Sequence, residues 1–424
     1  MPTPIAIIFL GRYSAIATII LPGSMGLTFP NIALYWIMIK RNIQLELETC
    51  AREYPAVTIT GPRQAGKTTL ARATFPHHAY ASFEQPLTRE QFRDDPVGFL
   101  KRHDGGAVFD EVQNVPELLS YLQQEIDENP QTGRYVLTGS QHFALSETIS
   151  QSLAGRTAVL ELLPFSISEL RDSTMLTSDL DDVLWRGAYP PVHDRKLRPA
   201  RWYAGYMATY IDRDLRQLSA VQNLDTFHRF MRLAAGNVGQ LLNSSRLAGD
   251  CGVDHKTIRH WLNLLQASYV AHLLPPYYEN FRKRVVKVPK IYFHDTGLAC
   301  HLLGINEPGQ LANHPLRGAI FENWVFAELA KSLANRGLSN RPYFWRTHGG
   351  QEVDFLIEHG RTVFGIEAKA GMTARPAAAR SVLNALENWR DAETRAVVVF
   401  GGDQGYETSN CRFIPWCDID QLLQ

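Results

Sequence analysis

One stretch of the sequence has the residue types and spacing of a phosphate-binding loop. Residues 61–68 read GPRQAGKT, which matches the pattern GxxxxGK[ST] in full. In such a loop, backbone N–H groups at the start of a helix surround the phosphates, and the helix dipole favours negative charge. Lys67 would reach the β- and γ-phosphates, and Thr68 would offer its hydroxyl to Mg²⁺. The pattern therefore predicts a site for ATP with Mg²⁺, and the residues expected at the nucleotide are Gly61, Pro62, Arg63, Gln64, Ala65, Gly66, Lys67, Thr68 and Thr69.

Two acids end a later apolar run, in which residues 106–111 read GAVFDE. Asp110 is placed to hold Mg²⁺ through water, and Glu111 is placed to polarise the attacking water. A solvated strand end is the alternative for such a pair. The complete phosphate loop upstream favours the catalytic interpretation.

Two further segments supply candidates for nucleotide sensing. Residues 135–140 read YVLTGS, and either Ser140 or Thr138 would sense the γ-phosphate, with a plain turn as the alternative. Arg156 follows in the stretch SLAGR. It would act as an arginine finger at a neighbouring subunit's nucleotide, or else it is a surface arginine.

Short apolar runs alternate with helical patterns around these motifs. The runs cover residues 56–61, 107–109, 135–138 and 157–163, and residues 116–128 (PELLSYLQQEIDE) have a helical pattern. Strands that alternate with helices indicate a parallel sheet covered by helices on both faces. The predicted fold class is therefore α/β, with a P-loop sheet that places the motifs at its strand ends.

The middle of the chain has the outline of a helix-turn-helix. Residues 241–274 give a short helix, a turn at 249–252 and a longer helix with apolar residues at helical spacing. The basic stretch 282–290 that follows has the character of a β-wing. DNA contact is one hypothesis and a protein–protein spacer is the other. The candidate DNA-binding residues are Lys256, Arg259 and His260 on the second helix, and Arg282 to Lys287 on the wing.

A third constellation is acidic and lies near the carboxy terminus. Asp354 lies in a strand-like run, and Glu367 and Lys369 share one face of the next run because side chains alternate along a strand. With Glu322 on the preceding helix, this D…ExK spacing resembles the PD-(D/E)XK nuclease fold. Asp354, Glu367 and Glu322 would hold Mg²⁺ to activate water, and Lys369 would stabilise charge on the scissile phosphate. A surface hairpin with ordinary charges is the alternative.

Taken together, the motifs resemble the AAA+ ATPases that carry a DUF4143-type carboxy-terminal region. The resemblance rests on TGPRQAGKTTL, FDEVQNVPELL, YVLTGS and SLAGRTAVLELLPFS. It implies an AAA+ domain over residues 38–170, a helical and winged-helix-like domain over 171–308, and a nuclease-like domain over 309–424. Residues 1–37 then form an apolar extension.

Three interpretations of this extension stay open. No charge falls between Arg12 and Lys40, which suits a membrane span, but prolines and glycines break the stretch into short apolar pieces. The second is that Met38 is the true start, which the resemblance supports, and the third is some other role. We expect a cytoplasmic protein, because the five scattered cysteines form no CxxC pair and indicate a reducing compartment, and we separately expect no membrane contact.

The 43 basic and 43 acidic residues exclude a globally basic nucleic-acid coat. The functional expectation is an ATPase that couples nucleotide binding and hydrolysis to a DNA-engaging, nuclease-like unit. The alternative is a nucleotide-dependent switch or scaffold that recruits a protein partner, with a carboxy-terminal domain that does not cleave. A homo-oligomer is compatible with either.

Overall fold

The computed structural model describes residues 17–19, 27–29, 39–140, 152–211, 223–277, 287–338, 341–389 and 392–423. The chain divides into two compact units, Met1–Lys40 and Arg41–Gln424. In the first unit, strands β1 (Ala17–Ile19) and β2 (Leu27–Phe29) form an antiparallel pair. No helix within the described ranges is long and apolar enough to cross a membrane. Met38 lies outside the described residues.

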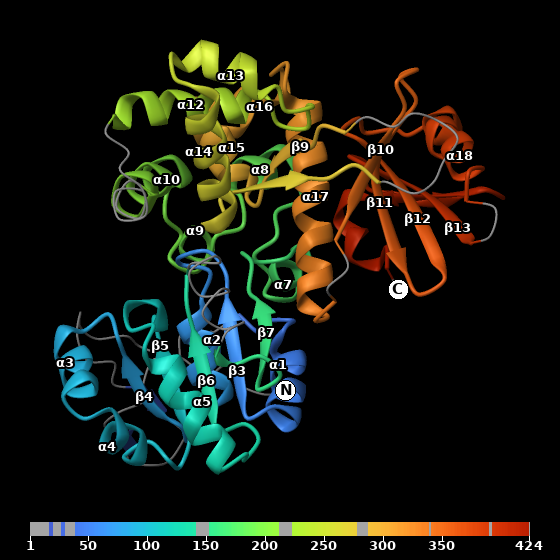
Figure 1. Cartoon of the computed structure of the whole chain (residues 1–424). Helices are drawn as coiled ribbons and strands as arrows, with labels where there is room; N and C mark the ends of the chain where they lie inside the picture. The colour runs from blue at the N-terminus through green and yellow to red at the C-terminus, as the bar shows by residue number, and fades with distance from the viewer. Residues whose placement is uncertain are drawn as a thin grey trace. The chain divides into compact units, whose positions relative to one another are not determined.

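A five-stranded sheet with all strands parallel forms the amino-terminal part of the second unit (Figure 1), which confirms the predicted fold class. Its order is β4-β5-β6-β3-β7, so the strand that carries Thr138 lies beside the phosphate-loop strand, as predicted. Strand β4 was not predicted, because its sequence AYAS lacks β-branched residues and its first half is exposed. The strands are β3 (Ala56–Thr60), β4 (Ala79–Ser82), β5 (Ala107–Asp110), β6 (Tyr135–Thr138) and β7 (Thr157–Glu161).

Helices cover both faces of this sheet because side chains alternate along each buried strand. Val108 and Val136 pack against helices α1 (Gln44–Glu53) and α2 (Lys67–Thr74). Phe109 and Leu137, one residue further along the same strands, pack on the opposite side. The elements on that side are α3 (Pro86–Asp94), α4 (Pro96–Lys101), η1 (Val112–Asn114) and α5 (Leu118–Glu128).

The middle region is mostly helical, as expected. Helices α13 and α14 form the predicted helix-turn-helix outline, but α13 continues through Gly249. The turn therefore begins only at Gly252, which has a φ of 70° and ends the helix in the left-handed conformation. The elements are α7 (Ile167–Asp172), α8 (Leu180–Arg186), α9 (Pro190–Asp194), α10 (Pro199–Tyr206), η2 (Met207–Ile211), α12 (Leu224–Gly236), α13 (Ser244–Cys251), α14 (His255–Ala267), β8 (Ala271–Leu274), β9 (Lys290–Phe293), α15 (Thr296–Leu302) and α16 (Pro308–Ala312).

The carboxy-terminal region is a mixed six-stranded sheet in the order β10-β11-β12-β13-β15-β14. Helix α17 packs on one face and α18 on the other, and the two strand-like runs expected around Asp354 and Glu367 are β11 and β12. The elements are α17 (Arg317–Asn335), β10 (Tyr343–Arg346), β11 (Glu352–His359), β12 (Thr362–Lys369), η3 (Pro376–Ala379), α18 (Arg380–Leu386), β13 (Glu393–Phe400), β14 (Tyr406–Glu407), β15 (Cys411–Pro415) and η4 (Trp416–Gln421).

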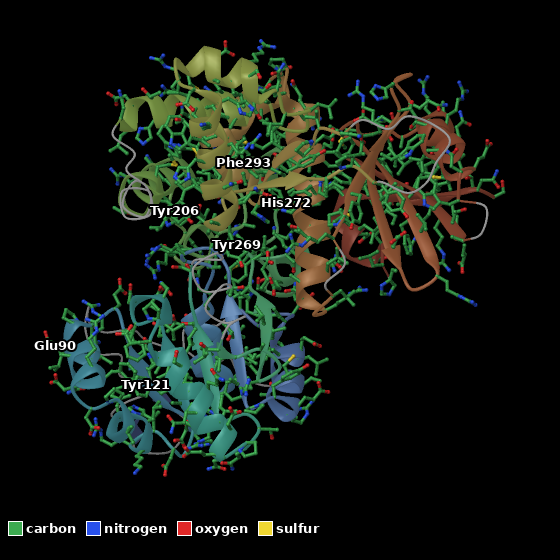
Figure 2. The ribbon with its side chains drawn as sticks, in the orientation of Figure 1. Glu90, Tyr121, Tyr206, Tyr269, His272 and Phe293 are labelled. Atoms are coloured by element: carbon green, nitrogen blue, oxygen red, sulfur yellow. The ribbon has the colours of Figure 1, made fainter. Side chains whose placement is uncertain are left out.

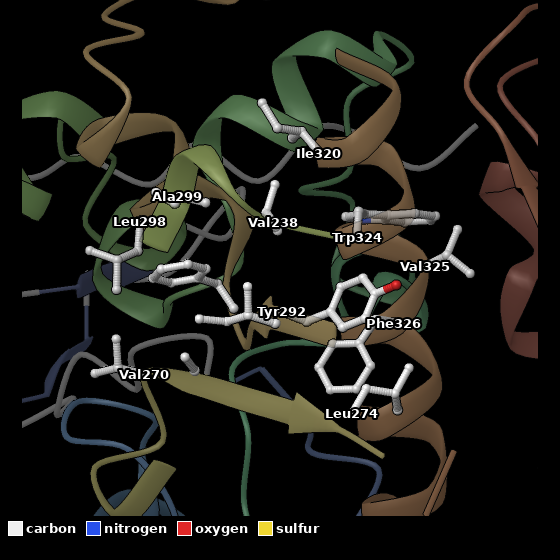
Figure 3. Packing of buried hydrophobic residues seen from close by; sticks show 14 of the residues in the cluster. Val238, Val270, Leu274, Tyr292, Leu298, Ala299, Ile320, Trp324, Val325 and Phe326 are labelled. Carbon is white, nitrogen blue, oxygen red and sulfur yellow. The ribbon is translucent and has the colours of Figure 1, made fainter. Parts of the chain in front are cut away.

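Helix α17 is buried along most of its length, and it contributes to a core shared by the middle and carboxy-terminal regions. Figure 3 shows Tyr292 of β9 beside Phe326 of α17, and the two rings stack with their centroids 4.9 Å apart. Phe355 of β11 completes the group from the carboxy-terminal sheet, 5.6 Å from the Tyr292 ring. Such close packing fixes where the polar residues of these elements lie.

Gly61, the glycine that opens the phosphate loop, gives a test of how closely the loop packs against the backbone of Leu162. A Cβ at Gly61 would lie 2.1 Å from the carbonyl oxygen of Leu162, and the φ of 139° at this residue is one that other residues rarely adopt. We expect backbone strain alone to lower the free energy of unfolding of Gly61→Ala by about 1–3 kcal/mol. Urea unfolding measures this. Gly105→Ala is the control because nothing lies within 4 Å of its Cβ, and an equal loss in both variants would contradict the prediction.

Candidate functional sites

The phosphate loop connects β3 to α2 and has an unusual backbone. Gly61, Gln64 and Gly66 have φ values of 139°, 62° and 97°, all in the left-handed region. Lys67 is the first residue of α2, and its Nζ donates to the carbonyl oxygens of Gly61 (3.0 Å) and Pro62 (2.9 Å). The ammonium group therefore lies back over the loop, where it is 5% exposed. This position suits a cation that contacts phosphates held by the loop.

The Asp110 carboxylate, at the end of β5, joins three other elements. Its Oδ1 accepts from the Thr68 hydroxyl of α2 at 2.7 Å and from the Thr138 hydroxyl of β6. Its Oδ2 accepts from the Tyr80 hydroxyl of β4 at 2.9 Å. Burial, followed by the charge of Asp110, raises the pKa of Tyr80 to about 12, so this phenol stays protonated and donates at neutral pH. The structure thus brings Thr68, Asp110 and Thr138 together.

Glu111 follows directly, in the left-handed conformation with a φ of 56°. Its Oε2 accepts from the Ser140 hydroxyl at 3.3 Å and from the Gln113 amide. The Gln113 amide also donates to Ser140 Oγ at 3.2 Å, and the Glu111 N–H donates to Thr138 Oγ1 at 3.3 Å. These contacts hold the Glu111 carboxylate against Ser140 and Gln113.

These residues fit Mg²⁺ and ATP by the chemistry of their groups. Mg²⁺ keeps several waters and takes one or two protein oxygens plus phosphate oxygens, so it needs no cage of protein carboxylates. The Thr68 hydroxyl and the Asp110 carboxylate, 2.7 Å apart, provide such a pair of oxygens. The loop residues 61–69, with Lys67 among them, would hold the phosphates.

Arg156 lies away from this group. Its guanidinium makes two hydrogen bonds to the Asp127 carboxylate, at 2.6 and 2.8 Å, and these bonds lower the pKa of Asp127. Arg156 precedes β7, whereas the loop follows the carboxyl end of β3, which is parallel to β7. The structure therefore does not bring Arg156 to the nucleotide site of its own chain. Its role in a neighbouring subunit stays a prediction.

Arg41 was not predicted, although it contacts the phosphate loop. Its guanidinium donates to the carbonyl oxygens of Ala65 (2.7 Å) and Leu163 (2.6 Å) and to the Glu169 carboxylate (3.0 Å). Arg41 is 6% exposed, so this is a buried ion pair that ties the loop to α7. No local motif around Arg41 could have indicated these contacts, because its partners lie 24 to 128 residues away.

In the carboxy-terminal region, the predicted acids do lie together. Glu322, Asp354 and Glu367 line one cavity of about 680 Å³. The Lys369 Nζ donates to Glu367 at 2.6 Å, and the Ala368 N–H donates to Asp354 at 2.9 Å. Burial, and then the charges of Glu322 and Glu367, raise the pKa of Asp354 well above its ordinary value.

A lysine that the sequence placed in the basic wing stretch lies inside this cluster. The Lys290 Nζ is 2.6 Å from Glu352, 2.9 Å from Glu322 and 3.9 Å from Asp354, and the residue is 2% exposed. Lys290 ends the basic stretch 282–290, whose composition does not show that β9 turns this side chain inward. Burial acts to lower the pKa of Lys290, but the three carboxylates outweigh it and raise the pKa.

The assignment of Glu322, Asp354 and Glu367 as Mg²⁺ ligands stays a prediction. Among the residues that the structure describes, no group of three His, Cys, Asp or Glu side chains is placed to hold one. The Lys290 ammonium occupies the space between Glu322 and Asp354 instead.

The candidate DNA-binding surface is described only in part. Lys256, Arg259 and His260 are exposed on α14, as a contact surface requires. Arg282 and the residues through 286 lie outside the described residues, and Lys287 is exposed.

Comparisons with known proteins agree with the division of the chain into three regions. An AAA domain matches residues 53–171, a domain of unknown function (DUF8612) matches 177–309, and another (DUF4143) matches 317–419. Uncharacterized protein Rv2008c of Mycobacterium tuberculosis and Uncharacterized protein Mb2031c of Mycobacterium bovis are each 32% identical over 411 residues. Each alignment covers 95% of this chain and 89% of the relative. The chain belongs to this family of AAA and DUF4143 proteins.

Family membership confirms the resemblance found in the sequence, and the AAA-type fold supports the binding and hydrolysis of ATP. Among solved structures, the Walker-type ATPase PABY2304 of Pyrococcus abyssi matches with a TM-score of 0.44 at 15% identity. That match covers 61% of this chain and 94% of the other.

The buried ion pair of Arg41 gives a test of this site. Arg41→Ala would leave the Glu169 carboxylate buried without its cation, so we expect a loss of about 3–5 kcal/mol in the free energy of unfolding. Chemical denaturation measures the loss. Arg52→Ala is the control, because Arg52 is exposed and hydrogen-bonds to Thr49 on the same helix, and we expect a change below about 0.5 kcal/mol. Similar values for the two variants would show that the Arg41 contacts contribute little.

Proposed function

We propose that this protein is an ATP hydrolase whose nucleotide state controls its carboxy-terminal region. The observation that carries the proposal is the Asp110 carboxylate, which accepts hydrogen bonds from Thr68, Thr138 and Tyr80 at the carboxyl ends of the sheet strands. These contacts gather the groups that a Mg²⁺·ATP site requires.

Each residue has a role in this mechanism. The backbone N–H groups of residues 61–69, apart from Pro62, bind the phosphates, and Lys67 offsets charge on the β- and γ-phosphates. Thr68 and Asp110 would hold Mg²⁺, which neutralises charge that develops on the transferred phosphoryl group. Glu111 accepts a proton from, or orients, the attacking water, and Ser140 holds that carboxylate in place.

Two hydrogen bonds connect the surroundings of the nucleotide site with the rest of the chain. Tyr269, which follows α14 and is labelled in Figure 2, donates to the Thr60 hydroxyl at 2.9 Å, and Thr60 directly precedes the phosphate loop. The Glu328 carboxylate of α17 accepts from the Ile167 N–H of α7 at 2.9 Å. Both contacts would respond to a movement of the loop.

The first candidate for the controlled activity is DNA engagement by the middle and carboxy-terminal regions. The exposed Lys256, Arg259 and His260 on α14 support it. So does the element order helix, three strands, helix, strand in α17, β10, β11, β12, α18 and β13, which suits the nuclease-like fold expected from the sequence.

The second candidate is a nucleotide-dependent switch that recruits a protein partner, with a carboxy-terminal domain that does not cleave. A specific observation favours it: Lys290 lies among the acids that would otherwise bind Mg²⁺. The equal numbers of acidic and basic residues agree with a protein partner.

Release of phosphate from ATP tests the proposal. With saturating Mg²⁺·ATP we expect turnover by the unchanged chain. Lys67→Ala and Glu111→Gln should each lower turnover at least about 100-fold, in the range found when a positioned acid–base group or a charge-stabilising group is removed. Glu90→Gln is the matched control, since Glu90 is exposed on α3 outside the phosphate loop. Unchanged hydrolysis by Lys67→Ala would sink the proposal.

The same assay with added duplex and single-stranded DNA separates the two candidates. DNA engagement predicts higher turnover with DNA, reduced when Lys256 and Arg259 are both changed to Ala and when salt is raised. The switch predicts turnover that DNA does not change, and no strand cleavage with Mg²⁺ or Mn²⁺.

A further inference from the structure

The acidic cluster of the carboxy-terminal region has a cation of its own. Glu322 comes from α17 and Glu352 and Asp354 come from β11, while Lys290 comes from β9 of the middle region. The Lys290 Nζ makes ion pairs with the two glutamates at 2.6 and 2.9 Å. Three separate elements therefore meet at one buried ammonium group.

Other donors of the chain also contact the carboxylates of the cluster. The Tyr292 hydroxyl donates to Glu322, and the Ala368 N–H donates to Asp354 at 2.9 Å. The Glu367 carboxylate accepts from Lys369 at 2.6 Å and from the Ser381 hydroxyl at 3.2 Å. Donors of the chain itself therefore contact each of these three carboxylates.

A divalent cation and Lys290 compete for the same volume. Mg²⁺ needs oxygens at about 2.0–2.1 Å in an octahedron, and the ammonium lies between the Glu322 and Asp354 oxygens that would supply them. Placing both cations there would bring two positive charges together, and they would repel each other. Lys290 is also tethered to β9, so its local concentration does not depend on the ion content of the solution.

We propose that Lys290 is the resident cation of the acidic cluster, which holds this ammonium group in the position where a divalent metal would bind. The cavity lined by Glu322, Asp354 and Glu367 is then a metal-free polar site, and Lys290 links β9 to α17 and β11. This role of Lys290 extends the proposal of a nucleotide-dependent switch. It rests on that proposed function only where it gives a biological use to a carboxy-terminal domain that does not cleave.

The binding of Mn²⁺ to the full chain tests the role of Lys290 without an assay of ATP hydrolysis. Electron paramagnetic resonance counts bound Mn²⁺ in the absence of nucleotide, so a failed ATPase assay and a failed metal assay are separate results. We expect the unchanged chain and Asp354→Asn to bind the same amount of Mn²⁺. We expect Lys290→Met to gain one site that is at least tenfold tighter than any site of the unchanged chain, and Lys290→Met with Asp354→Asn to lose it.

Two results would overturn the inference. One is a Mn²⁺ site in the unchanged chain that Asp354→Asn removes, because the acids would then hold a metal beside Lys290. The other is a folded Lys290→Met variant, by circular dichroism, that gains no site. Lys369→Met is the matched control, since this lysine pairs with Glu367 at the more exposed side of the cluster and its loss should create no tight site. If Lys290→Met does not fold, the comparison of the unchanged chain with Asp354→Asn decides alone.

Discussion

The nucleotide site depends on one carboxylate more than on any other group. Asp110 is 6% exposed and accepts hydrogen bonds from α2, β4 and β6, so its charge fixes the relative positions of three elements at the edge of the parallel sheet. A buried carboxylate is costly unless it is hydrogen-bonded, and here both oxygens have donors. In the proposed mechanism, Mg²⁺ takes over part of that role when ATP binds, so the donors that now face Asp110 would rearrange. The site is therefore set up to differ between its empty and nucleotide-bound states.

The route from this site to the carboxy-terminal region consists of buried polar contacts. Arg41 ties Ala65 of the phosphate loop to Glu169 of α7, and the Ile167 N–H at the start of α7 bonds to Glu328 of α17. Glu322, six residues earlier on the same helix, pairs with Lys290. Breaking a buried ion pair by removing one partner costs much free energy. Such contacts therefore suit a protein whose elements switch between two discrete arrangements. We regard α17 as the element through which a change at the loop would reach the acidic cluster.

The sequence predicted the features that depend on local pattern. GPRQAGKT between a β-branched run and a helical run indicated the phosphate loop, and GAVFDE and YVLTGS indicated the strand ends that meet it, because parallel strands present their carboxyl ends at one edge. Features that depend on distant partners were missed. Strand β4 lacks a β-branched pattern, Arg41 acts on residues far along the chain, and Lys290 stands in a stretch whose composition suggested an exposed wing. In the acidic cluster the predicted carboxylates do converge, but spacing alone could not show that a lysine from β9 joins them.

The most direct test of the account is whether Asp110 and Thr68 bind the Mg²⁺ of ATP. Calorimetric titration of the full chain with ATP, once with Mg²⁺ and once with a chelator, measures the part of the affinity that depends on the metal. We predict tighter binding with Mg²⁺ by at least about tenfold, which corresponds to about 1.4 kcal/mol, and we predict that Asp110→Asn loses this difference while still binding ATP. The account is contradicted if the unchanged chain binds no ATP, or if Asp110→Asn retains the full effect of Mg²⁺.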